Sequence, residues 1–310
     1  MKLTIPVRNL EEIRFAYKLW IRDVYAWFID QDFEKNKKWT WIYNWRITPD
    51  GNFQNIESII EAVEYCRNNE MTLNLTFNVL PFVWDEKLLT LALKNIRKIK
   101  AHNIIIADIN VMKYFQSEKI IVSTLSSLYN SPSIQFFLDR YPNIKRLVLP
   151  RELSIREKQS IMDDKQTQFE ILILNDWCYN SNAMCSSLHF WEIVKKVKYS
   201  CRRDNLYYSK SSNSDTQALQ KITWKRSDCK ICSIYFYKKY PDLYFKIAGR
   251  VKNTIALRKD MLFSKKVLDR LQLNENYSDF VSKNISLHQK IYWEKCDYNN
   301  CEYFKINDAS

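Results

Sequence analysis

The chain has 310 residues, of which 46% are hydrophobic, enough for the core of one large domain or two small ones. This composition excludes an intrinsically disordered protein. The net charge of +13 favours anionic partners such as RNA or small acids. The chain is also rich in Lys, Asn and Ile, a pattern that the base composition of a genome can produce by itself, so the charge has a second explanation.

No apolar segment of signal-peptide length opens the chain, and no later segment reaches the roughly 18 apolar residues of a membrane span. We therefore expect a cytoplasmic protein without membrane insertion. Cytosolic thiols stay reduced, so the eight cysteines are expected to bind metal or to be buried. Cys66 is predicted to lie in the core, and no role is assigned to Cys296 or Cys301.

Apolar runs and helical patterns alternate along the chain from residue 3 onward. Predicted strands cover residues 3–7, 24–29, 39–46, 73–78, 103–107, 120–123, 145–149, 169–174 and 244–247. Predicted helices cover residues 9–20, 55–68, 86–98, 131–141 and 155–162, with a short one near 111. About eight strands in this alternation favour a (β/α)8 TIM-barrel-like fold, with an open doubly wound sheet as the alternative. The alternating tryptophans and tyrosine of residues 39–45 are expected to pack in the core.

The predicted barrel domain spans residues 1–260 and contains a long cysteine-bearing excursion, residues 175–232, before the last strand. Its most loop-like stretch is residues 210–215. Residues 261–310 are predicted to be a C-terminal segment that is helical to about residue 283 and ends in a polar tail. In a parallel barrel, the functional end lies at the carboxyl ends of the strands.

Four cysteines of the second half, Cys178, Cys185, Cys201 and Cys229, are spaced like the ligands of an iron–sulfur cluster that joins distant loops. The first follows a predicted buried strand, residues 169–174, so it would lie at one edge of the sheet. Cys232 is the rival for the fourth place. With Cys229, Cys178 and Cys185 it would alternatively complete a tetrahedral zinc site, and unligated cysteines are the third reading.

Several motifs together resemble the collagenase-like peptidase family U-32. They are Arg146-Leu-Val-Leu-Pro-Arg-Glu-Leu-Ser154, Trp177-Cys178 with Cys185, Asp228-Cys229, Lys246-Ile-Ala-Gly-Arg250 and the opening Leu3–Asn9. The resemblance covers roughly residues 1–260. It implies a 4Fe-4S cluster held by Cys178, Cys185, Cys201 and Cys229.

Well-understood members of this family resemble oxygen-independent hydroxylases, in which prephenate is implicated as the oxygen donor. Short members act as paired subunits on quinone precursors, and longer members act on ribosomal or transfer RNA. The length of this chain resembles the short members, which implies a heteromeric partner subunit. Ala248 replaces the family's glutamate, and Tyr179 and Asn180 replace its usual glycines, so the substrate does not transfer.

The leading interpretation is an iron–sulfur-dependent, oxygen-independent hydroxylase or related redox-modifying enzyme acting on an aromatic ring of a small molecule or RNA. The alternative is a peptide-modifying enzyme, or a structural or partner subunit with a non-catalytic cluster. Proteolysis ranks last, because neither a Gly-x-Ser-x-Gly elbow nor a His-Glu-x-x-His motif occurs.

Arg151 and Arg250 are the candidates for binding an anionic donor, because both follow predicted strand ends and guanidinium groups bind carboxylates with paired hydrogen bonds. The alternative for Arg151 is an ion pair with Glu152 or another loop carboxylate. His189, four residues after Cys185, is a candidate proton donor, cluster neighbour or ligand, with capping or packing as the alternative.

Polar residues at two other strand ends are also candidates. Asn78 and Ser123 are placed to bind polar substrate atoms or to stabilise turns. The basic residues 195–198 and 202–203, with aromatic neighbours, would contact RNA or form a solvated helix face.

Overall fold

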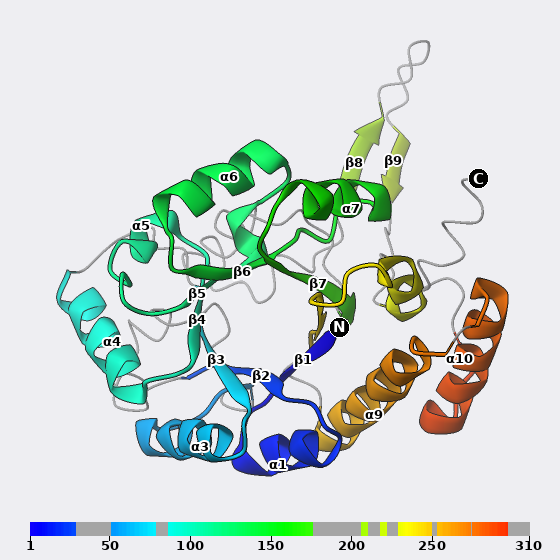
Figure 1. The fold of residues 1–310 in the computed structure, drawn as a ribbon, viewed down its shortest axis with the longest axis horizontal. Coiled ribbons are helices and arrows are strands. Elements are labelled where there is room, and N and C mark those ends of the chain that lie inside the picture. Colours follow the sequence, from blue (N-terminus) through cyan, green and yellow to red (C-terminus); the bar gives the residue numbers. More distant parts are fainter. Residues whose placement is uncertain are drawn as a thin grey trace.

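A closed barrel of eight parallel strands forms the centre of the molecule (Figure 1), in the order β1-β10-β7-β6-β5-β4-β3-β2. This computed structural model describes residues 1–28, 51–78, 86–175, 206–209, 218–221, 229–249, 253–273 and 275–296. The strands are β1 Lys2–Pro6, β2 Asp23–Ala26, β3 Thr72–Phe77, β4 Asn103–Ile106, β5 Ile120–Val122, β6 Ile144–Val148, β7 Gln168–Leu174 and β10 Tyr244–Ile247. The predicted TIM barrel is confirmed, and the open doubly wound sheet is excluded because β1 pairs with both β10 and β2.

Helices surround the barrel and cover its outer face (Figure 1). They are α1 Leu10–Lys18, α3 Ile56–Asn68, α4 Glu86–Ile99, α5 Ile109–Met112, α6 Ser131–Arg140, α7 Ile155–Asp164, α9 Thr254–Arg270 and α10 Tyr277–Tyr292, with 3-10 helices η3 Thr124–Ser126 and η5 Ile231–Tyr237. The expectation that helical structure ends near residue 283 is wrong, because α10 continues to Tyr292. The domain division at residue 260 stays a prediction, and α9 runs across it. The predicted strand 39–46 lies outside the described residues.

Side-chain caps explain where these helices begin. Asn9, Asn55, Asn130, Asn253 and Asn276 precede α1, α3, α6, α9 and α10, and each side-chain oxygen accepts a hydrogen bond from the backbone of the first turn. Ser154 and Glu157 form a capping box at α7. The chain has only two glycines, so other residues take the left-handed backbone conformation after helices: Trp20, Glu70, Lys100 and Trp293.

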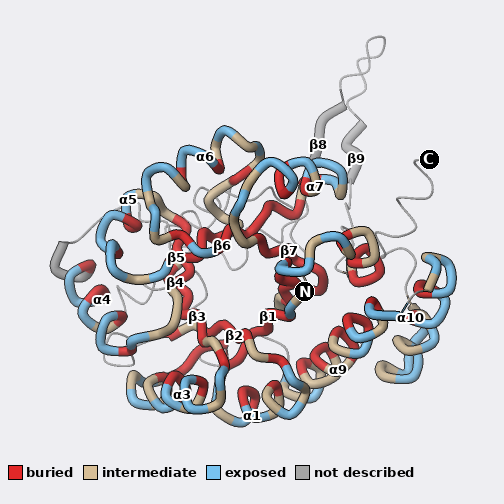
Figure 2. The backbone as a smooth tube through the Cα atoms, viewed as in Figure 1, coloured by how far each residue is buried: buried red, intermediate tan, exposed pale blue. Residues whose placement is uncertain are grey.

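The main core lies between the barrel and its helices, as the buried strands and inner helix faces of Figure 2 show. In β4, Ile104 and Ile106 belong to this core, whereas Ile105 belongs to a smaller cluster. Alternation along a strand therefore places Ile105 inside the barrel. Cys66 is fully buried in the main core, as predicted, and burial raises the pKa of its thiol to about 12.

Two layers of side chains fill the barrel interior. The apolar layer consists of Tyr25, Ile105, Ile121, Val148 and Leu172. Three of its members follow a charged residue by two positions, the next inward-facing place on each strand: Asp23, Arg146 and Glu170. A charged layer therefore lies on the amino-terminal side of the apolar layer.

The chain between β7 and β10 contains the predicted excursion, of which the structure describes only parts. Strands β8 Leu206–Ser209 and β9 Ala218–Lys221 pair antiparallel in a separate sheet outside the barrel (Figure 1). Residues 229–230 lead into η5. Among the described residues, no helix is both long and apolar enough to cross a membrane.

Candidate functional site

Cys229 lies at the carboxyl end of β7. It forms an isolated antiparallel bridge with Leu174, the last residue of that strand. The backbone N–H of Lys230 donates to the carbonyl oxygen of Ile173 at 2.8 Å. These contacts hold the partly buried Cys229 at the barrel end where active sites of this fold lie.

The other predicted cluster ligands, Cys178, Cys185 and Cys201, lie outside the described residues, as do His189 and Arg250. Across the described ranges, no three His, Cys, Asp or Glu side chains come together in a way that would hold a metal ion. That finding does not test the predicted cluster, because three of its four cysteines are not among those residues.

Cys232, the rival fourth ligand, has a more enclosed position than Cys229. It lies in the first turn of η5 with 9% of its surface exposed and belongs to the main apolar core. Cys229 is less buried and packs against the edge of the same core. The two cysteines therefore differ in environment although they are three residues apart.

A polar cluster supports the turn after β7. The Asn175 side-chain amide donates to Asp260 of α9 at 2.8 Å, and the Tyr292 hydroxyl of α10 donates to the other oxygen of the same carboxylate at 2.6 Å. Asn175 itself has φ 60, a left-handed conformation that asparagine tolerates. Burial, the Asp260 carboxylate and, to a smaller extent, Cys229 raise the pKa of Tyr292. The two C-terminal helices thus hold the chain at the point where it leaves β7.

Arg151 follows β6 at the same end of the barrel and is 9% exposed. Its Nε lies 3.6 Å from a carboxylate oxygen of Glu152, which is the ion pair that the sequence offered as the alternative role. The Arg151 carbonyl oxygen accepts a hydrogen bond from Lys230 Nζ at 3.1 Å. Two predicted site segments, those of Arg151 and Cys229, are therefore in contact.

Polar groups line the carboxyl end of β3 and β5. Thr76 lies on the inward face of β3, and Asn78 is the first residue after that strand. Thr76 Oγ1 and Asn78 Oδ1 are buried with no hydrogen-bond partner among the described residues. Ser123 caps η3 by accepting from the Leu125 N–H at 3.3 Å, which is the turn-stabilising alternative. The β3 groups remain available to a ligand, whereas the Ser123 oxygen is already in use.

Charged residues inside the barrel were missed by sequence reasoning. The Arg146 guanidinium donates to both carboxylate oxygens of Asp23 at 3.1 and 2.9 Å, and also to Glu170 at 2.8 Å. Lys246 Nζ donates to the second oxygen of Glu170 at 2.6 Å. Burial alone would raise the pKa of Glu170, but Lys246 and Arg146 hold it below its usual value. Two cations and two anions therefore balance within this part of the interior.

Arg146 is a charged residue, yet only 3% of its surface is exposed inside the barrel. A signal for this network was present in the sequence. β6, β7 and β10 each carry a charged residue at an inward position between apolar residues, namely Arg146, Glu170 and Lys246. Both faces of a parallel strand are usually buried, and charged residues are rarely fully buried unless they are paired, so these positions indicate ion pairs inside the barrel.

The fold and this site define a (β/α)8-barrel protein whose cysteine-bearing segment meets the carboxyl ends of the strands. The sequence pattern of Peptidase family U32 matches residues 9–299, and the chain belongs to that family. The comparison with curated proteins found no match.

The comparison with solved structures found chains that are similar to this one, two of which follow. The U32 peptidase Mk0906 is 8% identical, with 80% of this chain and 93% of that one covered and a TM-score of 0.49. A xylose isomerase domain-containing protein from Salmonella typhimurium is 10% identical, with 86% and 96% covered and a TM-score of 0.34.

Proposed function

We propose that this U32-family protein is an iron–sulfur-dependent, oxygen-independent hydroxylase or related redox-modifying enzyme. Its target would be an aromatic ring in a small molecule or RNA. The proposed cofactor is a 4Fe-4S cluster bound by Cys178, Cys185, Cys201 and Cys229, and prephenate is the proposed oxygen donor. When bound, such a cluster supplies one-electron redox chemistry.

The position of Cys229 carries this proposal. Cys229 pairs with Leu174, and Cys178 follows Leu174 by only four positions in the chain. Four residues span at most about 14 Å, so covalent geometry alone keeps Cys178 near the same end of the barrel. The donor set, if complete, would be four thiolates, which suit an iron–sulfur cluster.

The described residues of this end fit the other needs of the proposed reaction. Arg151 would orient an anionic donor, and its closeness to Lys230 places a second cation beside it. Thr76 and Asn78 would bind polar atoms of the aromatic substrate, because their buried oxygens lack partners within the described segments. The apolar layer below them, including Leu172 and Val148, would exclude water from the barrel side of the site.

Anaerobic purification followed by iron, sulfide and zinc analysis tests the cofactor. The wild-type chain should contain about four iron and four sulfide per chain if the cluster is the 4Fe-4S type. Single Ser replacements of Cys178, Cys185, Cys201 and Cys229 should each lower the iron content, and Cys232→Ser should not. A colourless protein that contains zinc would refute the cluster. If Cys232→Ser loses iron and Cys229→Ser does not, the fourth ligand is Cys232 and not Cys229.

The donor site has a separate test. Prephenate binding to the cluster-loaded protein should weaken in Arg151→Ala and in Arg250→Ala while iron content stays at the wild-type level. The control is Lys165→Ala, which removes one cation from a partly exposed ion pair with Asp164 at the end of α7. Wild-type affinity in both arginine variants would reject the proposed donor clamp without affecting the cluster assignment.

A further inference from the structure

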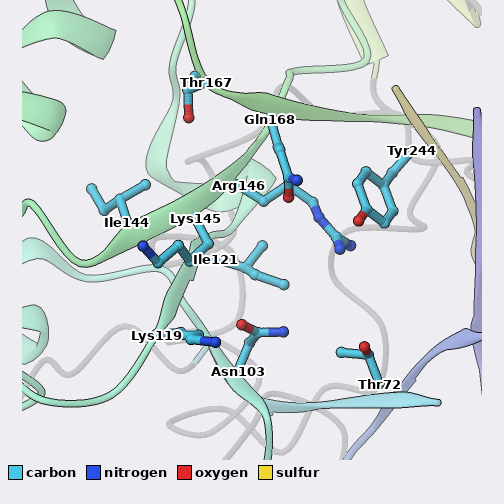
Figure 3. A pocket seen from close by; sticks show the side chains of 10 residues that line it. All are labelled: Thr72, Asn103, Lys119, Ile121, Ile144, Lys145, Arg146, Thr167, Gln168 and Tyr244. Carbon is cyan, nitrogen blue, oxygen red and sulfur yellow. The ribbon is translucent and has the colours of Figure 1, made fainter. Parts of the chain in front are cut away.

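The amino-terminal mouth of the barrel contains a cavity of about 400 Å³, whose lining side chains Figure 3 shows. Cys229 lies at the opposite end, beside the last residue of β7. Its lining includes the first residues of five strands, and Lys119 directly precedes a sixth. The full lining is Thr72, Asn103, Lys119, Ile121, Ile144, Lys145, Arg146, Thr167, Gln168 and Tyr244. This volume lies within the usual range of small-molecule sites.

The charge of this cavity is one-sided. Lys119, Lys145 and Arg146 line it, and no Asp or Glu is among its lining residues. The Arg146 charge is already balanced, because its guanidinium donates to Asp23 and Glu170. Lys119 and Lys145 are exposed and make no ion pair within the described part of the chain. The uncompensated positive charge therefore comes from these two lysines.

Hydrogen-bonding groups surround the two lysines. Thr72, Asn103, Thr167 and Gln168 bring hydroxyl and amide groups to the same cavity. Arg146 Nε, also on this lining, is a buried donor that has no hydrogen-bond partner among the described residues. The Arg146 guanidinium lies over the Tyr244 ring, with 3.3 Å from its carbon to the ring centroid, a cation–π contact within the same lining.

The cavity is separate from the proposed redox site. The apolar layer that contains Tyr25, Val148 and Leu172 lies between the charged layer and the carboxyl ends of the strands. A ligand at the amino-terminal mouth would therefore not contact Arg151 or Cys229. The amino-terminal face of such barrels usually serves stability, so a basic cavity there needs its own explanation.

We propose that this cavity is a second binding site, which takes a small molecule carrying phosphate or carboxylate groups. Lys119 and Lys145 would attract the anion, and the Thr, Asn and Gln side chains would complete its hydrogen bonds. The limited volume of about 400 Å³ favours a small molecule over a nucleic-acid backbone, which binds along extended grooves. Ile121 and Ile144 would contact the apolar part of the ligand.

Calorimetric titration with inorganic phosphate and with succinate, at one ionic strength set with NaCl, tests the site. At least one of these anions should bind saturably to the wild type, and the preferred one identifies the acidic group. In K119Q/K145Q, binding should be about tenfold weaker or lost, since two charges are removed. K94Q/K98Q removes two exposed lysines of α4 and should bind as the wild type does.

A second measurement needs no variant. Acetylation by an N-hydroxysuccinimide ester is followed by peptide mass spectrometry. A saturating concentration of the anion should slow the acetylation of Lys119 and Lys145 and should leave the acetylation rate of Lys94 unchanged. The proposal is overturned if neither anion binds, if K119Q/K145Q binds as tightly as the wild type, or if both double variants lose binding equally. Iron content reports on the redox site alone and should be the same in all three proteins.

Discussion

The side-chain amide of Asn175 donates a 2.8 Å hydrogen bond to the buried carboxylate of Asp260, 85 residues later in the chain. This contact joins the end of β7 to α9. The segment that begins at Asn175 leads directly to Cys178. A contact of this kind can set the position of a metal ligand without touching the metal.

Asp260→Asn should therefore lower iron loading as well as stability. The carboxylate accepts hydrogen bonds from both Asn175 and Tyr292, whereas an amide has one acceptor oxygen, so one donor loses its partner. The expected loss is ~1–3 kcal/mol in urea unfolding. Tyr292→Phe is the control, because it removes the second hydrogen bond and keeps the first. Equal iron in both variants and the wild type would show that Asn175 does not position the cluster segment.

Glu170→Gln should destabilise the barrel more than any exposed carboxylate change. Glu170 is fully buried and accepts from Arg146 and Lys246, so its loss removes one carboxylate from two buried cations. Arg146 keeps its pair with Asp23, so Lys246 is the cation that loses its carboxylate partner, and we expect a cost of ~3–5 kcal/mol. Glu275 forms ion pairs with Arg270 and Lys283 that are more exposed than those of Glu170. Glu275→Gln should therefore cost less than ~1 kcal/mol in the same denaturation experiment.

The stability of the wild type should also fall at acid pH in a way that Glu170 explains. The pKa of Glu170 is lowered in the folded chain, so its contribution is present above the unfolded value of about 4.3 and is lost as the pH falls below it. Urea midpoints measured from pH 6 to pH 3 should drop more steeply for the wild type than for Glu170→Gln. Parallel curves would mean that Glu170 has the same pKa in both states.

Gly249→Ala and Lys100→Gly should change stability in opposite directions. Gly249 has φ 96, and an added Cβ would lie 3.1 Å from the Asn175 Cβ, so the alanine is strained by both backbone and contact. We expect a loss of ~1–3 kcal/mol. Lys100 follows α4 with φ 53, a left-handed conformation that costs a residue with a side chain ~1 kcal/mol. Glycine adopts this conformation without that cost, so Lys100→Gly should stabilise the fold. Thermal unfolding of the two variants compares them directly.

Cys66 should be inert to alkylating reagents in the native protein. Its thiol is fully buried and burial raises its pKa to about 12, so almost no thiolate forms at pH 8. Iodoacetamide followed by peptide mass spectrometry should label Cys66 only after unfolding. If Cys66 of the native protein reacts as fast as an exposed thiol, this part of α3 does not belong to a stable core.

The sequence determined the elements and their order. The alternating strand and helix patterns predicted most barrel elements within a few residues, among them the strand that ends at Leu174. The asparagine caps of five helices and the alternating burial of Ile104–Ile106 were observed only in the structure. Local patterns report which face of an element is buried, and repeated strands and helices then favour a barrel. The position of Cys229 at the strand ends also agrees with that reading.

Only the tertiary structure decided which distant side chains meet. Asp23, Arg146, Glu170 and Lys246 come from four strands, and their contacts exist because the sheet closes and places them inside one barrel. The basic cavity likewise gathers the starts of strands that are far apart in the sequence. No periodicity encodes these pairings, since periodicity gives the direction of a side chain and closure of the barrel gives its neighbours.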